Sequence, residues 1–329
     1  PPPHETNEPE VLRSDSMNLI DLFKLRPAPP RVGPPRQRRA VLALGGGGAR
    51  GLAHFGAVQM VGEAGIHTER FVGVSIGALV GAMCALDPEI RRVQSQAIEF
   101  LLSPTFSRNQ HLLFGTTGSQ LDDVESGVMA WYNRVRHLYS AHRRITRAAT
   151  RQSLMPAGIL SEAIEALVPD IEFADLPTPL SIVTTDLRSG HRIVLENGPL
   201  RSAIRASMAI PGIFPPVRWG EMQLCDIGVI DSLPSTVAKS YATDLTIAVD
   251  VGQAHERVED CMTALDVIMR MQDIGETMMR RDKIQLADLV IRPELQGVDW
   301  FDFRHPERIM ELGRSAARKR LARLAQLVV

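Results

Sequence analysis

The sequence predicts an α/β protein in which helices cover both faces of a central, mostly parallel sheet. From residue 40 onward, short apolar runs alternate with longer stretches of helical periodicity. Strands separated by helices form parallel sheets, because the crossover helix returns the chain to the edge where the next strand begins. In addition, 44% of the 329 residues are hydrophobic, which suffices for one large core. We therefore expect a three-layer α/β/α fold.

The expected elements follow from these runs in chain order. The first strand is the aliphatic run 40–44, and a helix follows it to residue 64. A second strand at 71–74 leads directly into a helix that ends near residue 86. Further strands are expected at 180–184, 192–195, 245–251 and 288–291. Residues from about 87 to 175 carry no clear strand, so they predict a helical cap.

Composition divides the chain into three parts. Residues 1–38 form an arm or linker, since nine of the first 35 residues are proline and arginines accumulate there. Residues 39–255 form the main α/β domain, with the cap inserted at about 87–175. Residues 256–329 are expected to add a last strand and helices that pack on this domain.

Two basic amphipathic helices are expected, one in the cap and one from residue 306 onward. In the cap helix, an apolar stripe that includes Trp131 and Leu138 accompanies a row of arginines. Such a row is either a solvated face or a surface for lipid phosphates. The C-terminal helix is interpreted as docking onto the domain. The cap arginines are Arg134, Arg136, Arg143, Arg144, Arg147 and Arg151.

Charge, cysteines and motifs exclude several classes of protein. A net charge of −1 gives no reason to expect a nucleic-acid partner. Without paired cysteines or a His-Glu-x-x-His pair, no metal site is expected. The widely spaced Cys84, Cys225 and Cys261 indicate a reducing, cytoplasmic setting and no disulfides. No apolar run has the length of a membrane span, so membrane contact would be peripheral.

A glycine-flanked serine ends the second expected strand. In Gly73-Val74-Ser75-Ile76-Gly77 the chain passes from strand to helix without an intervening loop. A turn this sharp needs residues without a Cβ on either side, and it lifts the serine Oγ above the sheet on a helix N-terminus. Ser75 is therefore the candidate nucleophile, and Gly73 and Gly77 form its elbow.

A second glycine turn, Gly46-Gly47-Gly48-Ala49-Arg50-Gly51, follows the first strand. Its spacing also fits a dinucleotide-binding loop, but that class needs an acid at the end of the second strand, where this chain has Ser75. A kinase-type phosphate loop is excluded because no Gly-Lys-Ser/Thr follows. Successive glycines let several N–H groups point into one space. We expect an oxyanion hole built from Gly46, Gly47, Gly48 and Arg50.

The base that activates Ser75 has two kinds of candidate. A conventional triad places its histidine late in the chain, which leaves His255 and His305, with His255 favoured by the strand before it. The other candidate is Asp226, which ends an apolar run and precedes a turn that contains Gly228.

Taken together, these motifs closely resemble the bacterial patatin-like phospholipases, relatives of neuropathy target esterase. The glycine loop, the serine turn, the block Arg205-Ala206-Ser207-Met208-Ala209-Ile210-Pro211-Gly212-Ile213-Phe214-Pro215-Pro216 and Asp226-x-Gly228 occur in the same order. The resemblance implies a patatin-like fold and a Ser75–Asp226 dyad that needs no histidine, with Gly228 in the dyad loop. It also implies cofactor-free hydrolysis of phospholipid or lysophospholipid esters through an acyl-enzyme, at a membrane surface.

One position departs from the family pattern, which usually has glycine where this chain has Ile227. A β-branched residue resists positive φ, so a turn that required it would be shaped differently here. Two alternatives stay open: a carboxylesterase for soluble esters that uses His255, and a weakly active lipid-binding module. Headgroup preference, acyl position and oligomeric state are left open by the sequence.

Overall fold

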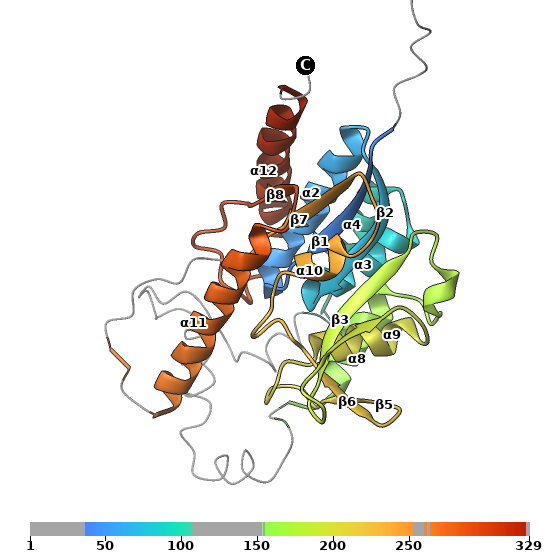
Figure 1. Ribbon diagram of the computed structural model, residues 1–329. Coiled ribbons are helices and arrows are strands. Elements are labelled where there is room, and N and C mark those ends of the chain that lie inside the picture. Colours follow the sequence, from blue (N-terminus) through green and yellow to red (C-terminus); the bar gives the residue numbers. More distant parts are fainter. Residues whose placement is uncertain are drawn as a thin grey trace, which may run out of the picture. The chain divides into compact units, whose positions relative to one another are not determined.

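A computed structural model describes residues 37–104, 106, 153, 155–252, 260–261 and 264–326. The chain divides into two units, Pro1–Arg36 and Gln37–Val329, and every described residue belongs to the second. Its strands form one eight-stranded sheet (Figure 1). They are β1 (Arg39–Leu44), β2 (His67–Val74), β3 (Leu180–Asp186), β4 (Arg192–Leu195), β5 (Val217–Trp219), β6 (Met222–Cys225), β7 (Leu245–Val249) and β8 (Leu289–Ile291).

Helices connect most of these strands. They are η1 (Gly48–Leu52), α2 (Ala53–Glu63), α3 (Ile76–Leu86), α4 (Ile90–Leu101), α8 (Gly158–Leu167), η2 (Phe173–Asp175), α9 (Leu200–Met208), α10 (Ser235–Lys239), α11 (Ala264–Ile284) and α12 (Pro306–Gln326). None of these helices combines the length and the apolar character needed to cross a membrane.

The strand order is β5-β6-β3-β2-β1-β7-β8, and β4 pairs with β3. The five strands from β3 to β8 in this order pair in parallel with one another, whereas the pairs β3–β4, β3–β6 and β5–β6 are antiparallel. The expected mostly parallel α/β fold is therefore confirmed. The sequence prediction missed β5 and β6, because Arg218 and Gln223 interrupt these short strands, whereas the equally short β4 and β8 each contain an apolar run.

Hydrophobic residues cover both faces of the sheet, as β1 illustrates. Leu42 and Leu44 belong to the main core, together with side chains of α2, α3 and α12. Val41 and Ala43, which alternate with them, belong to a second cluster with α10 and the loop after β6. A strand that is buried on both faces consists of a continuous apolar run, which is why β1 can be predicted from the sequence.

The C-terminal helix α12 lies directly against α2. A Cβ on Gly56 of α2 would stand 1.9 Å from the carbonyl oxygen of Met310, and one on Gly313 of α12 would stand 2.0 Å from that of Ala53. Only glycine fits at either position, so the two backbones approach as closely as helices can. β8 extends the same sheet beside β7.

Within the expected cap, the described helices are α4, α8 and η2. The basic helix predicted around Arg134 to Arg151 lies outside the described residues. The domain boundaries near residues 38 and 255 stay predictions.

Candidate active site

Ser75 occupies a strained turn between β2 and α3. Its φ is 55°, and among the described residues it is the only non-glycine residue with positive φ. A conformation of this kind costs about 1–3 kcal/mol and persists where the surroundings hold it. A Cβ on Gly77 would stand 2.2 Å from the Leu44 carbonyl oxygen, and one on Gly73 would stand 2.5 Å from the Ala78 Cα. The elbow can therefore form only with glycine on both sides.

The strand register brings a second chain segment to the end of β2. Val183 of β3 pairs with Val74 of β2, and Thr185 of β3 pairs with Cys225 of β6. Both Val183 and Thr185 also pair with β4. A strand has only two edges, so β2 and β6 lie on the same edge of β3, opposite β4. They run toward each other and end two residues apart, a separation of about 7 Å.

Ser75 and Asp226 are the next residues after these two strand ends. The Ser75 hydroxyl hydrogen-bonds to the Asp226 carboxylate, which also accepts the Gly228 N–H at 2.6 Å. Asp226 is only 2% exposed. Burial raises its pKa from 3.8 to about 6, although the two hydrogen bonds act in the opposite direction. The carboxylate is thus a stronger base than an exposed aspartate and is still ionised at neutral pH.

The block after α9 supports both residues from behind. Ser207, at the end of α9, accepts the Ser75 backbone N–H at 2.9 Å and donates its hydroxyl hydrogen to the Val183 carbonyl at 2.7 Å. The Ala209 carbonyl accepts the Asp226 N–H at 2.9 Å. The sequence singled out this block as a motif but not the individual role of Ser207, because a serine inside a helical pattern carries no signal of its tertiary partner.

The glycine loop lies against the same site. A Cβ on Gly46 would be 3.5 Å from the Ser75 Cβ. The Gly46 N–H, however, donates to the Ser232 carbonyl at 2.8 Å. Among the residues that the structure describes, no group accepts the N–H of Gly47 or Gly48. Of the three glycines, Gly46 is the one whose N–H is taken by another group of the described chain.

Arg50 and His54 fasten this loop to the first helix. Arg50 is 7% exposed and donates from Nε to the Gly47 carbonyl at 3.3 Å. Burial lowers its pKa to about 10, so it remains charged at neutral pH. His54 Nε2 lies 2.8 Å from the Gly45 carbonyl, which can only accept, so Nε2 carries the proton. Burial lowers the pKa of His54 to about 4, and a packing role fits this neutral ring.

A network of buried charges behind the loop was not visible in the sequence. Asp250, 1% exposed, accepts Arg280 of α11 at 3.0 Å and Arg292 at 2.6 Å. Ser232, whose carbonyl oxygen accepts the Gly46 N–H, donates its hydroxyl hydrogen to Glu276 of α11. Helix α11 is thereby joined to both sides of the glycine loop. The five charged and polar side chains come from segments far apart in the chain, and their spacing follows no motif.

Of the two candidate histidines, the structure describes His305 and not His255. His305 is exposed at the start of α12. Within the described ranges, the groups that bond to the Asp226 carboxylate are Ser75 and Gly228. No cluster of potential metal ligands occurs among these residues either.

Ile227 lies in the dyad loop without backbone strain. Its φ is not positive, and the side chain is 4% exposed in the second core cluster with Val74, Val183 and Leu233. The isoleucine therefore fills space under the dyad loop, and whether this turn differs in shape from the family pattern stays a prediction.

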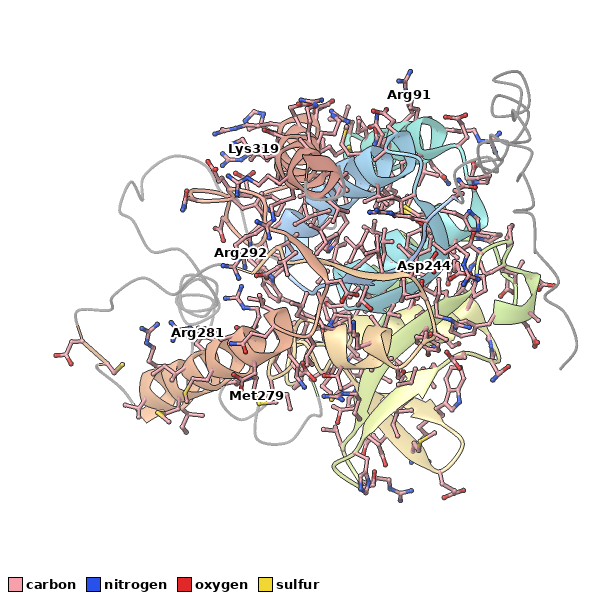
Figure 2. The ribbon with its side chains drawn as sticks, turned by 45° about the horizontal axis from the view of Figure 1, so that its top comes forward. Arg91, Asp244, Met279, Arg281, Arg292 and Lys319 are labelled. Carbon is pink, nitrogen blue, oxygen red and sulfur yellow. The ribbon has the colours of Figure 1, made fainter. Side chains whose placement is uncertain are left out.

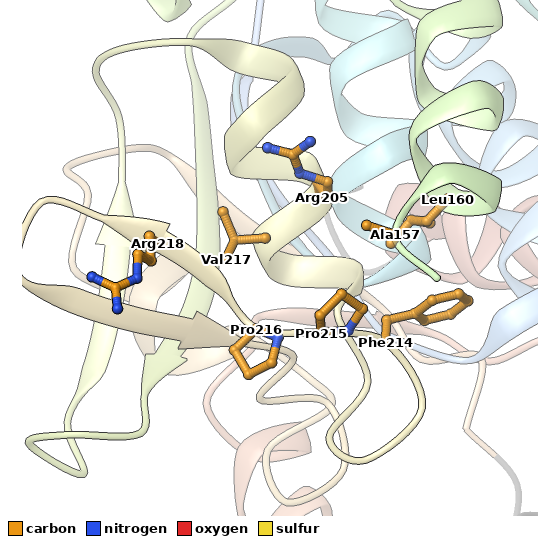
Figure 3. A pocket seen from close by; sticks show the side chains of 8 residues that line it. All are labelled: Ala157, Leu160, Arg205, Phe214, Pro215, Pro216, Val217 and Arg218. Atoms are coloured by element: carbon orange, nitrogen blue, oxygen red, sulfur yellow. The ribbon is translucent and has the colours of Figure 1, made fainter. Parts of the chain in front are cut away.

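A cavity of about 250 Å³ opens between α8, α9 and β5. Figure 3 shows its eight lining residues, among which Phe214, Pro215 and Pro216 continue the block after α9. Its walls are mainly apolar, and two arginines, Arg205 and Arg218, complete them.

The comparison with protein families finds one match. The family model described as patatin-like phospholipase covers residues 42–239, a range that holds the glycine loop, Ser75 and Asp226 and ends before α11.

Curated relatives and solved structures extend this result. An NTE family protein of Mycobacterium tuberculosis is 26% identical over 311 residues, which cover 87% of this chain and 47% of that protein. Another from the same species is 30% identical over 225 residues, covering 68% of this chain and 52% of that protein. Mouse patatin-like phospholipase domain-containing protein 6 is 30% identical over 65% of this chain and 14% of its own length. The chain thus spans about half the length of these mycobacterial relatives. Among solved structures, VipD from Legionella pneumophila matches with a TM-score of 0.45 at 16% identity, over 88% of this chain and 67% of that one.

Proposed function

The chain belongs to the patatin-like phospholipase family, and we propose that it hydrolyses acyl esters of phospholipids or lysophospholipids with Ser75 as nucleophile and Asp226 as base. The family supports a lipid-hydrolysing esterase. The observation that carries the finer proposal is the hydrogen bond from the Ser75 hydroxyl to the buried Asp226 carboxylate. A serine with glycine on both sides and a base already in contact has the arrangement that nucleophilic catalysis needs.

In the first half-reaction, Ser75 Oγ attacks the ester carbonyl carbon and Asp226 takes the hydroxyl proton. The tetrahedral intermediate collapses, the ester C–O bond breaks, and Asp226 returns the proton to the leaving alcohol. The products are an acyl-Ser75 ester and a lysophospholipid or a glycerophospho-alcohol. Asp226 then takes a proton from water, whose oxygen attacks the acyl carbon. The bond from this carbon to Ser75 Oγ breaks, Asp226 returns the proton to Oγ, and the fatty acid leaves.

The negative charge that develops on the carbonyl oxygen needs donors. The N–H groups of Gly47 and Gly48 are the proposed oxyanion hole, since Gly46 already bonds to Ser232. Arg50 holds the loop through the Gly47 carbonyl and in this proposal does not touch the substrate. Each oxyanion donor typically contributes about 3–4 kcal/mol to stabilising the transition state.

The pKa of Asp226 fits the role of base. General-base catalysis is most effective when the pKa lies near the working pH, because the group is then both ionised and a good proton acceptor. An exposed aspartate would be too weak a base, and burial among apolar side chains moves the pKa of Asp226 to about 6.

Product analysis tests the proposal. Mass spectrometry after incubation with mixed phospholipid and lysophospholipid vesicles should detect free fatty acid with the wild type and none with Ser75→Ala. Ser95→Ala, at an exposed position on α4, is the matched control and should keep full activity. A fluorophosphonate that labels Ser75→Ala at the wild-type rate would rule out Ser75. Loss of turnover in His255→Ala but not in Asp226→Asn would replace the dyad by the histidine-dependent esterase.

A further inference from the structure

Helix α11 carries an unusual concentration of exposed apolar side chains. Eleven large hydrophobic side chains are exposed among the described residues, and six of them lie on α11. These six are Val267, Ile268, Met271, Ile274, Met278 and Met279. Contiguous exposed apolar surface on a protein of this kind usually marks an interaction site.

The six side chains form one continuous face. At about 100° per residue, they and Gly275 fall within an arc of about 140°. No charged residue of the segment 267–279 lies within this arc. The opposite side of α11 bears Asp273 and Arg280, which are 6% and 5% exposed and face the body of the protein. Figure 1 shows that the N-terminal half of α11 extends beyond the sheet.

The width of this face argues against pairing with a second helix. A two-stranded coiled coil uses a narrow seam of two positions per heptad, whereas an arc wider than about 100° suits a broad apolar surface. Methionines supply three of the six side chains, and their flexible thioethers adapt to irregular partners such as acyl chains. Arg281, which is exposed, borders one edge of the face, and Figure 2 shows it on the opposite side of α11 from Met279. A cation at the rim of an apolar helix face is typical of helices that lie at an anionic lipid surface.

The inner side of α11 ties this face to the candidate active site. Glu276 accepts the Ser232 hydroxyl, and Arg280 pairs with Asp250. Ser232 in turn holds the Gly46 N–H. The loop between Asp226 and Ser232 also exposes Ile230, at 49%. A lipid surface against α11 would therefore lie beside the loops that bear the proposed oxyanion hole and base.

We propose that the outer face of α11 is the surface by which this protein docks on a phospholipid bilayer, with its apolar side chains inserted among the headgroups and upper acyl chains. The proposal rests on the proposed function for the identity of the partner. It differs from the prediction for the cap arginines, because apolar insertion persists at high salt whereas attraction between charges fades.

The test compares two pairs of substitutions in the full chain. Ile268→Gln/Met271→Gln changes side chains that are 62% and 61% exposed on α11. Leu102→Gln/Leu187→Gln changes side chains that are 67% and 52% exposed elsewhere. Partition onto vesicles of phosphatidylcholine with a minority of phosphatidylglycerol is measured by flotation, at low and high salt. We expect the α11 pair to weaken partition about tenfold or more at both salt concentrations, and the control pair to leave it unchanged.

Binding is measured in the Ser75→Ala background as well, so that it does not depend on turnover. If the wild type releases no fatty acid but binds vesicles in a way that requires α11, the proposed activity is wrong and the proposed docking surface is still supported. Equal binding by the α11 pair and the wild type would overturn the surface, as would a wild type that does not bind. If the wild type is a dimer and the α11 pair is a monomer, the face is assigned to a second copy of the chain. If the α11 pair alone shows a large drop in thermal stability, the face is assigned to packing within this chain.

A measurement without substitutions covers the case in which the α11 pair does not fold. Oxidation of Met271, Met278 and Met279 in the wild type should slow several-fold when vesicles are added, while the half-buried Met222 of β6 serves as the internal reference. Unchanged oxidation of the three methionines on bound protein would overturn the proposal.

Discussion

Replacing Asp226 by asparagine should inactivate the protein and at the same time stabilise it at neutral pH. Asparagine keeps the size of the side chain and an acceptor for the Gly228 N–H, but it can take no proton from Ser75. We expect kcat/KM to fall by about 10²–10⁴-fold, the usual range for loss of a general base. The gain in stability follows from the cost of burying a carboxylate, which the neutral amide does not have.

The size of the effect follows from the pKa of Asp226. Burial raises it from 3.8 to about 6, and this difference corresponds to about 3 kcal/mol at 1.36 kcal/mol for each pKa unit. Below about pH 4 the carboxyl is protonated in both the folded and unfolded states, so folding costs nothing extra. Between about pH 4 and pH 6 the carboxyl is ionised in the unfolded state and protonated in the folded state, so folding must take up a proton and the free energy of unfolding falls as pH rises. Above about pH 6 folding buries the charge, and the loss of stability is complete. The asparagine variant lacks this loss.

Urea unfolding of both proteins between pH 4 and pH 8 tests the prediction. The free energy of unfolding of Asp226→Asn, relative to the wild type, should rise by up to about 3 kcal/mol over this range, with its midpoint between the two pKa values. Asp170→Asn, at an exposed position, is the control and should show no such rise. A difference that did not depend on pH, or that fell as pH rose, would refute the assignment of Asp226 as a buried carboxylate with a raised pKa.

Four further predictions concern the base, its surroundings and the cap. The kcat/KM of the wild type should drop about tenfold from pH 7 to pH 5 as the base is protonated, and a profile flat over that range would argue against an aspartate base. Ile227→Gly should lower the free energy of unfolding by at least about 2–5 kcal/mol, because a buried side chain is removed, whereas Ile227→Val should lower it by only about 0.5–1.5 kcal/mol. Turnover per folded molecule should stay equal or rise in Ile227→Gly. A severe loss of turnover would mean that Ile227 aligns the dyad. Arg280→Met should lower kcat more than it raises KM, with partial rescue in Arg280→Lys, because Asp250 and Glu276 lose a buried partner behind the glycine loop. Equal activity at equal stability would exclude a positioning role. Gln at Arg143, Arg144 and Arg147, which lie outside the described residues, should weaken binding to anionic vesicles by about 1 kcal/mol per charge at low salt and less at high salt.

The features that the sequence determined by itself are local. The serine elbow can be predicted because Gly73 and Gly77 lie within two residues of Ser75. At Gly77, only glycine tolerates the close approach of the Leu44 carbonyl. β1 and the second half of β2 are predictable because burial on both faces demands unbroken apolar runs, whereas the polar first half of β2, from His67 to Arg70, was missed. Each of these requirements acts between neighbours in the chain, so the residues that satisfy it appear together.

The candidate site as a whole depends on contacts that no local pattern records. The resemblance to a family selected Asp226, but its contact with Ser75 arises because β2 and β6 end two residues apart along the same edge of β3, and β6 was not predicted from the sequence. The Gly46 N–H looks free in the sequence and is taken by Ser232 in the structure.

Burial decides the rest. The pKa of Asp226 depends on the apolar side chains packed around it, and the absence of strain at Ile227 depends on a core that receives its side chain. Helix α11 was expected only as one of several C-terminal helices, and its two faces became distinct once Glu276 and Arg280 were placed against the glycine loop. Desolvation and long-range pairing are properties of the assembled chain, because the groups that produce them lie tens to hundreds of residues apart.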